Sequence, residues 1–328
     1  MAEMLQVTNL KKYFPTKHGM LHAVDNVSFS LEAGKTIGIV GESGCGKSTL
    51  GRAVIGLNEA TDGQVLFEGK DITHLRGGKR RQALKNMQMI FQDPYSSLDP
   101  RKAVFDLIAE PLKLHHMCRN KLELAVRVDE LMDTVGLAKR LTYAYPHELD
   151  GGRRQRIGVA RALALSPKFI VCDEPVSALD VSIQAQILNL LQDLQDQKGI
   201  AYMFITHDMS VVKHISDDIM VMYVGCAVEK CGARELFRRP LHPYTKGLLS
   251  AIPVPKITGE RKRILLRGEL SVPIDPPPGC RFAKRCQYAS EACFQTQPAL
   301  QEVIPGHFAA CHHIQEINDL REEHKDAN

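Results

Sequence analysis

The chain contains no long apolar run. No stretch of about 18 consecutive apolar residues occurs, so we expect no membrane-spanning helix. The N-terminus also lacks the basic-then-apolar order of a secretory signal peptide. The formal net charge is only +4, and Lys and Arg are mixed with acidic residues, so the composition does not require nucleic acid as a partner. These absences predict a cytoplasmic protein, and any work at a membrane would be that of a peripheral partner.

Tight Cys-x-x-Cys pairs, internal repeats and low-complexity tracts are absent as well. Most of the nine cysteines are scattered, which argues against the disulfide framework of a secreted protein. In a reducing compartment a cluster of cysteines favours metal binding, and four thiolates suit either zinc or an iron–sulfur cluster. Such a cluster lies near the C-terminus and consists of Cys280, Cys286, Cys293 and Cys311.

The most informative feature present is a phosphate-binding loop pattern at residues 41–49, with an apolar strand before it and a helical segment after it. Glycines let successive backbone N–H groups point at phosphate oxygens, and the helix N-terminus adds partial positive charge. We expect Lys47 on the outer phosphates and the Ser48 hydroxyl on magnesium. The alternative is a Gly-rich turn that only begins a helix. The expected nucleotide-binding residues of this loop are Ser43, Gly44, Cys45, Gly46, Lys47, Ser48 and Thr49.

Strand and helix patterns alternate after the loop. Strands are expected at 169–172, 201–206 and 219–223, and helices at 181–196 and 209–215. A helical signal covers most of 104–165. This order predicts an α/β protein with a βαβ sheet core and a helical insertion, and 328 residues leave room for a smaller appendage. The stretch 252–279 is rich in proline, which predicts a stiff linker.

Two acidic residues follow one of the predicted strands. Asp173 at the end of a buried strand that faces the phosphate loop can hold magnesium. The next residue, Glu174, can orient and activate a water molecule for in-line attack on the γ-phosphorus of a nucleotide. The alternative is a solvated Asp-Glu pair at a strand terminus.

Two further candidates are single residues. His207 follows another predicted strand, where its imidazole could reach the γ-phosphate, although a lone His is more often structural. Tyr13 lies upstream of the loop, where an aromatic ring can stack on adenine; packing in the core is the alternative.

With these motifs in place, the chain resembles the ATP-binding subunits of ABC transporters over nearly its whole length. The family's motifs occur in order: the loop at 41–49, Gln92 of the Q-loop, the signature region at 149–156, Asp173 with Glu174, the D-loop at 177–180 and the switch residue His207. The segments 90–94, 96–101 and 241–245, with the Pro-rich tail and its cysteines, resemble more narrowly the ATPase subunits of dipeptide and oligopeptide importers.

The resemblance implies a P-loop NTPase fold of the ABC type, with an antiparallel β subdomain, a helical insertion and a small Cys-rich C-terminal extension. We expect a nucleotide-binding domain at 1–250, with its helical subdomain at about 93–165, and the linker and cysteine region at 251–328. The resemblance further implies catalytic roles for Glu174 and His207, and it implies that Gln92 contacts the nucleotide and magnesium. Other implied nucleotide contacts are Asp180 and, toward ATP on a partner subunit, Asp150, Gly151 and Gly152.

The implied function is ATP hydrolysis that powers import of dipeptides and oligopeptides. The implied partners are a second, non-identical ABC ATPase subunit, two transmembrane permease subunits and, indirectly, an extracytoplasmic peptide-binding protein, which puts the chain at the cytoplasmic face of the membrane. Import of nickel or another small solute is the alternative. A soluble ABC ATPase of DNA repair or translation is a weaker one, because long coiled-coil inserts and a second cassette are absent.

One position departs from the family pattern. The signature usually reads Leu-Ser-Gly-Gly-Gln, whereas Asp150 replaces the Ser and Arg153 the Gln here. An ionised Asp150 would repel the γ-phosphate, and two like charges at ~4 Å interact by about 4 kcal/mol at an intermediate dielectric. Arg153 could compensate, or Asp150 could simply cap the following helix. We predict that the ATP site completed by this signature hydrolyses slowly or differently.

The resemblance also favours a 4Fe-4S cluster on Cys280, Cys286, Cys293 and Cys311, as a clip for a small tail without a core of its own. Zinc is the second alternative, and reduced or disulfide-paired cysteines are the third.

Overall fold

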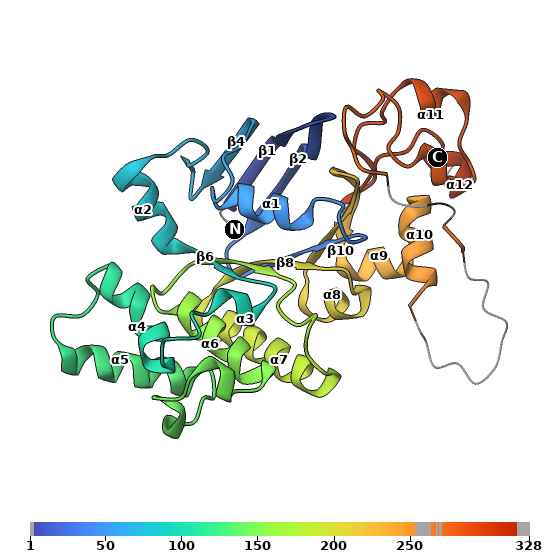
Figure 1. Cartoon of the computed structure of the whole chain (residues 1–328). Helices are drawn as coiled ribbons and strands as arrows, with labels where there is room; N and C mark the ends of the chain where they lie inside the picture. The colour runs from blue at the N-terminus through green and yellow to red at the C-terminus, as the bar shows by residue number, and fades with distance from the viewer. Residues whose placement is uncertain (1–2, 253–263, 267, 269–270, 320–328) are drawn as a thin grey trace, which may run out of the picture.

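A computed structural model describes residues 3–252, 264–266, 268 and 271–319. Much of the predicted linker, at 253–263, 267 and 269–270, lies outside the described residues. The described part contains two β-sheets with helices packed on and between them (Figure 1). No helix in this part of the chain combines the length and the apolarity needed to span a membrane.

The larger sheet has eight strands in the order β11-β12-β10-β9-β3-β8-β7-β6. Strands β6, β7, β8, β3 and β9 are parallel, and β10, β12 and β11 continue the sheet antiparallel. The bounds are β3 Thr36–Val40, β6 Met87–Ile90, β7 Phe169–Asp173, β8 Ala201–Thr206, β9 Asp218–Tyr223, β10 Cys226–Gly232, β11 Gln301–Ile304 and β12 His307–Ala309.

The smaller sheet is antiparallel, in the order β2-β1-β4-β5, with β1 Glu3–Thr16, β2 Gly19–Glu32, β4 Asp62–Phe67 and β5 Lys70–Asp71. Helix α1, Lys47–Val54, lies between the two sheets (Figure 1). A Cβ added to Gly51 of α1 would meet Val171 and Ile205 of the larger sheet, so α1 packs directly on it. One apolar core therefore joins β1, β2 and β4 to one face of β3, β7 and β8.

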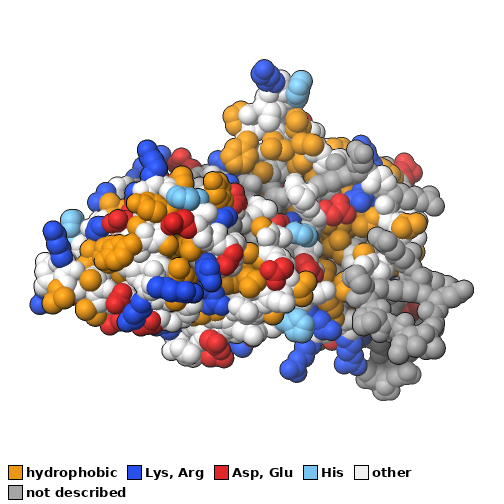
Figure 2. Space-filling view, turned by 60° about the horizontal axis from the view of Figure 1, so that its bottom comes forward, with side chains coloured by type: hydrophobic (Ala, Val, Ile, Leu, Met, Phe, Trp, Pro, Cys, Tyr) orange, Lys and Arg blue, Asp and Glu red, His pale blue; other side chains and the backbone are white. Residues whose placement is uncertain are grey.

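The opposite face of the larger sheet is covered by a helical layer (Figure 1). Alternate residues of β7 and β8, such as Ile170 and Tyr202, point into this second core, as the two-residue period of a strand requires. The layer and the helices around it comprise α3 Pro94–Ser97, α4 Val104–Leu114, α5 Lys121–Thr134, α6 Gly151–Leu163, α7 Val181–Lys198 and α8 Met209–Ile215, with 3₁₀ turns at Lys139–Leu141 and Pro146–Glu148. Helix α2, Gly77–Asn86, lies on the other side, near β4 (Figure 1). Figure 2, turned toward this layer, shows charges of both signs interspersed with hydrophobic side chains.

The C-terminal part pairs with the larger sheet and packs against it. Strand β12 pairs with β10, and the buried carboxylate of Glu229 on β10 accepts hydrogen bonds from the backbone N–H groups of Leu241 and His242 and lies 2.7 Å from His307 Nε2. Phe282 packs against Tyr223 and Tyr244, so the tail shares a core with the rest of the chain. Its helices are α9 Ala233–Arg238, α10 Pro243–Ser250, α11 Glu291–Gln295 and α12 Ile314–Ile317, with a 3₁₀ turn at Ala283–Arg285.

Candidate functional site

The phosphate-binding loop connects β3 to α1 at the carboxyl edge of the parallel strands. Gly44 and Gly46 have φ angles of 80° and 102°, which side-chain-bearing residues rarely adopt. A Cβ at Gly46 would also collide with the carbonyl oxygen of Ala23 on β2. The backbone of the loop therefore requires glycine at these two positions.

Lys47 and Ser48 begin α1 and point back into the loop. Lys47 is buried, and its Nζ donates to the carbonyl oxygens of Gly41 at 2.8 Å and Glu42 at 2.9 Å. The Ser48 hydroxyl donates to Asp173 Oδ1 at 2.6 Å. Cys45 lies in the same loop and is 1% exposed, and burial raises the pKa of its thiol. The structure thus brings the predicted loop residues and the predicted magnesium ligand together.

Asp173 ends β7, next to β8, and its side chain is 0% exposed. Only one of its oxygens is hydrogen-bonded: Oδ2 has no hydrogen-bond partner, and Arg52 approaches it no closer than 3.6 Å. Burial raises the pKa of this carboxyl group. A buried carboxylate oxygen left open beside a serine hydroxyl fits the oxygen ligands that magnesium takes in proteins.

Three predicted residues from three different strand ends converge on one point. Gln92 Nε2 donates to Glu174 Oε2 at 2.9 Å, and His207 Nδ1 lies 3.3 Å from Glu174 Oε1. Glu174 itself has a φ of 46°, in the left-handed region, and its backbone N–H donates to Ile205 O of β8 at 2.9 Å. A strained backbone at a side chain with two converging partners is typical of a functional position.

The predicted residues of the signature and of the D-loop lie at the beginning of two helices of the helical layer. Asp150 caps α6 by accepting from Arg153 N at 2.8 Å, and its other oxygen lies 3.5 Å from Arg153 Nε. Its side chain is 60% exposed. Gly151 and Gly152 open the same helix, and Asp180 caps α7 by accepting from Ile183 N at 3.0 Å. Asp150 is a helix cap, and because its side chain is exposed, it can also face the γ-phosphate of ATP on a partner subunit.

Tyr13 does not present a free ring. Its ring stacks on His22, with centroids 3.9 Å apart, and its hydroxyl donates to Asp25 Oδ1 at 2.6 Å. One face of the ring predicted to stack on adenine is thus covered by a neighbouring imidazole.

The prediction of an iron–sulfur cluster is wrong. Among the described residues, which include all four cysteines of the tail, no group of three or more His, Cys, Asp or Glu side chains could hold a metal ion. Zinc has no support for the same reason. The thiols are partly or fully buried, and burial raises the pKa of Cys280 and Cys311 to about 11. The tail packs on β10 and α10.

Two loop contacts escape sequence analysis. Tyr244 OH accepts from Glu42 N at 2.9 Å, and Arg285 Nη1 donates to Glu42 Oε2 at 2.8 Å. These partners are 202 and 243 residues away from the loop in the sequence, and no local pattern connects them.

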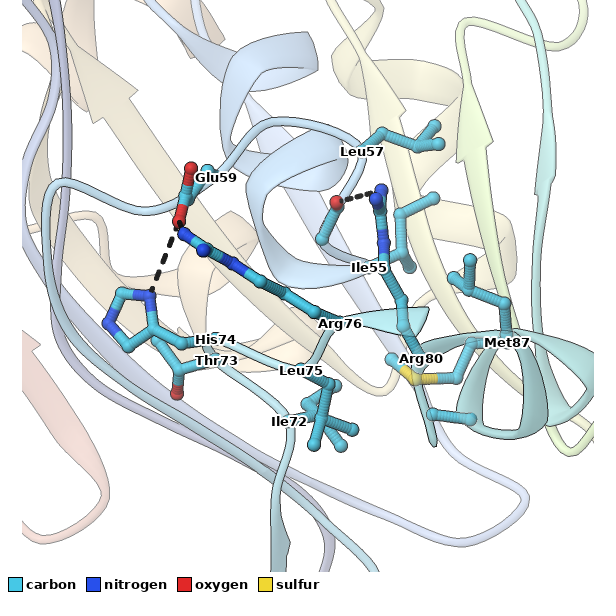
Figure 3. Close-up of a pocket in the computed structure, with 13 residues that line it drawn as sticks. Ile55, Leu57, Glu59, Ile72, Thr73, His74, Leu75, Arg76, Arg80 and Met87 are labelled. Atoms are coloured by element: carbon cyan, nitrogen blue, oxygen red, sulfur yellow. Dashed lines mark hydrogen bonds and ion pairs between the residues drawn. The ribbon is translucent and has the colours of Figure 1, made fainter. Parts of the chain in front are cut away.

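A small pocket near the C-terminal end of α1 contains none of the predicted site residues (Figure 3). Its cavity volume is about 150 Å³. Arg76 and Glu59 form an ion pair of 3.2 Å across it, and Arg80 donates to Gly56 O at 2.6 Å. Its polar groups are therefore satisfied within the chain, and the candidate site is the open carboxyl edge of the sheet.

Comparisons with known proteins agree with this geometry. The family model described as ABC transporter matches residues 24–177, and the model described as oligopeptide/dipeptide transporter, C-terminal region, matches 228–293. The oligopeptide transport ATP-binding protein AppF of Bacillus subtilis (strain 168) is 51% identical, over 94% of this chain and 97% of that protein. The dipeptide transport ATP-binding protein DppF of Haemophilus influenzae is 47% identical, over 95% and 97%.

The chain belongs to the ABC transporter ATP-binding subunits. The solved structure of cbiO1 from Clostridium perfringens, part of the ABC transporter complex cbiONQ, is similar with a TM-score of 0.64 at 27% identity, over 73% of this chain and 92% of that one. The dimeric structure of the ATP-binding cassette MJ0796 bound to ADP and Pi is similar with a TM-score of 0.65 at 26% identity, over 70% of this chain and 99% of that one. The predicted fold of an ABC ATP-binding subunit is confirmed, and so is the prediction of an ATP-hydrolysing subunit from the peptide branch of the family.

Proposed function

We propose that this ABC ATP-binding subunit powers the import of dipeptides and oligopeptides from the cytoplasmic face of the membrane. It would act with a second, non-identical ABC ATPase subunit, two transmembrane permease subunits and an extracytoplasmic peptide-binding protein. The match of 228–293 to the peptide-transporter C-terminal region and the names of the relatives support the peptide branch. Nickel or another small solute remains the second candidate substrate, because an ATPase subunit does not touch the cargo.

The observation that carries the ATPase assignment is the convergence of Gln92 and His207 on Glu174, beside the open oxygen of Asp173. In this proposal loop residues 43–49 bind the phosphates of ATP, with Lys47 on the outer ones. Ser48, Asp173 and Gln92 would hold Mg²⁺, which neutralises charge on the β- and γ-phosphate oxygens when it is bound. Tyr13 would contact adenine with the ring face that His22 does not cover.

Hydrolysis would proceed by attack of a water molecule on the γ-phosphorus, with release of ADP. Glu174 orients that water and accepts its proton, since a carboxylate is a suitable general base at this position. His207 and Gln92 hold the Glu174 side chain from two sides, at 3.3 Å and 2.9 Å. The bond from the γ-phosphorus to the bridging oxygen of ADP breaks, and the protein supplies orientation and charge rather than a covalent intermediate.

The remaining site residues would act across a dimer interface. Asp150, Gly151 and Gly152 would close on ATP bound by the partner ATPase, and Asp180 would lie at the same interface. The exposed Asp150 supports a second ATP site that works slowly or differently, whereas Arg153, 3.5 Å away, would offset part of its charge. The exposed aromatic residues Phe91 and Tyr95, next to Gln92, are candidates for contact with a permease subunit.

We further propose a nucleotide-binding domain at 1–250, with its helical subdomain at about 93–165, followed by an extension at 251–328 that carries four cysteines. The solved cassettes cover 70–73% of this chain, which supports an addition to a common core.

The decisive experiment is reconstitution of the chain with permease subunits, a partner ATPase and a binding protein of a peptide importer. ATP hydrolysis should rise when the binding protein carries a peptide, and Glu174→Gln should lower it by roughly 10²–10⁴-fold without loss of ATP binding. The equivalent substitution in the partner should have a different effect. Stimulation by a nickel complex instead of peptide would overturn the substrate assignment, and equal losses from both substitutions would overturn the asymmetry.

A further inference from the structure

The C-terminal region reaches the phosphate-binding loop through one arginine. Arg285 ends the 3₁₀ turn Ala283–Arg285, and its guanidinium donates to the carboxylate of Glu42 at 2.8 Å. The Arg285 side chain is 9% exposed, and its guanidinium lies over the ring of Tyr223 at 5.8 Å. A charge-assisted hydrogen bond between partly buried groups is shorter and stronger than a neutral one. This contact therefore holds the Glu42 side chain of the loop in place and is more than an exposed surface ion pair.

Glu42 is held on all of its polar groups. Its backbone N–H donates to Tyr244 OH at 2.9 Å, and its carbonyl oxygen accepts from Lys47 Nζ at 2.9 Å. Two of these three partners, Tyr244 and Arg285, come from the region after residue 240, and the third is the lysine of the loop itself. The position of Lys47 is thus linked, through Glu42, to Tyr244 near the end of the nucleotide-binding domain and to Arg285 beyond it.

The same short segment is anchored a second time, on Asp25 of β2. Arg281 Nη2 donates to Asp25 Oδ2 at 2.6 Å, and Asp25 also accepts from Tyr13 and lies 3.2 Å from His22 Nδ1. Burial alone would raise the pKa of Asp25, but the hydrogen bonds from Tyr13 and His22 and the charge of Arg281 hold it below its usual value. Asp25 is therefore ionised at neutral pH and fixes the segment that carries Arg285.

Charge gives a second reason for the contact. Glu42 places a carboxylate in the loop that would surround the polyanionic phosphates of ATP, and an unpaired carboxylate there would repel them. Arg285 offsets this charge from outside the loop. We infer that Arg285 is a positioning residue for nucleotide binding: it acts through Glu42 to hold the phosphate-binding loop and Lys47 in the binding geometry. This inference rests on the proposed binding of ATP by residues 43–49.

The test compares Mg-ATP affinity of the full-length wild-type chain with that of Arg285→Ala, Arg285→Lys and Lys284→Ala, an exposed neighbour that provides a matched loss of charge. We expect Arg285→Ala to raise the Kd about tenfold, Arg285→Lys to restore part of the loss, and Lys284→Ala to stay within about twofold. In a Glu42→Ala background, Arg285→Ala should change the Kd less than about twofold, because the contact is already gone.

A second readout separates loop positioning from general damage. Cys45 in the loop and Cys172 on β7 are both buried, so iodoacetamide reaches each thiol only when the structure around it opens. Peptide mapping measures the alkylation of each cysteine in the absence of nucleotide. Arg285→Ala should raise alkylation of Cys45 several-fold and leave Cys172 unchanged. Unchanged affinity, or equal rises at both cysteines, would overturn the inference. A wild-type chain that fails to bind Mg-ATP would instead overturn the proposed function itself.

Discussion

Two fully buried carboxylates of the larger sheet, Asp173 and Glu229, differ in how completely the protein satisfies them. Glu229 on β10 accepts two backbone hydrogen bonds on different oxygens, and His307 lies 2.7 Å from one of those oxygens. Asp173 at the end of β7 has one hydrogen bond, from Ser48, and an oxygen without one. A buried acid that is satisfied from all sides stabilises the fold, whereas a buried acid left open costs stability until a ligand binds. The contrast identifies which of the two belongs to a site.

The largest effect on stability is expected at Glu229. Glu229→Gln removes the charge and one acceptor while leaving His307 and two backbone donors buried, so the free energy of unfolding should fall by about 3 kcal/mol. Chemical denaturation measures it, with the exposed Glu291→Gln as a control that should change stability by less than about 0.5 kcal/mol. Wild-type stability in Glu229→Gln would remove the basis for the contrast.

A pH-dependent effect, which approaches this size only near pH 4, is expected next to Glu229. Burial lowers the pKa of His242 to about 4, although the nearby Glu229 opposes this shift. Above pH 6.5 the imidazole is neutral in both states; between about 6.5 and about 4 the unfolded chain binds a proton that the folded chain does not. Stability should therefore fall by up to about 3 kcal/mol as the pH drops through this range.

The matched variant for this test is His242→Asn. His242 Nδ1 accepts from Tyr244 N at the start of α10, and an Asn side chain can cap a helix in the same way without titrating. The difference in unfolding free energy between wild type and variant should shrink below pH 6.5. A difference that is constant from pH 7 to pH 4.5 would show that His242 does not contribute.

The smallest effect on stability is expected at Asp173. Since burial raises the pKa of this carboxyl, its ionised form destabilises the folded state at neutral pH, and Asp173→Asn should leave stability unchanged or raise it by about 1 kcal/mol. The same variant should lose the increase in ATP affinity that Mg²⁺ gives, measured with Mg²⁺ and with EDTA. A loss of stability as large as that of Glu229→Gln would show that Asp173, like Glu229, stabilises the fold.

The sequence predicts the core of the site because its residues are placed by rules that act locally. Lys47 and Ser48 follow from a loop pattern, and Asp173, Glu174 and His207 follow from strand ends, which parallel strands bring to one edge of a sheet. Gln92 came from the family resemblance, and the structure places it on Glu174.

What the sequence could not predict depends on contacts between distant segments. The pairing of β12 with β10 and the contact of Arg285 with Glu42 join residues that no local pattern relates. The cysteine cluster shows the opposite error. Spacing brings Cys280, Cys286, Cys293 and Cys311 into one region, but side-chain direction and burial decide whether thiols converge on a metal, and these do not.

The pairing of β12 with β10 has a consequence for the boundary of the larger sheet. Without β11 and β12, the outer side of β10 would present a row of unpaired N–H and C=O groups, a template for another strand. Strand β11 now forms that boundary; it is only four residues long, and it carries the exposed, charged Glu302. The C-terminal segment thus replaces a sheet edge open to self-association with one that discourages it.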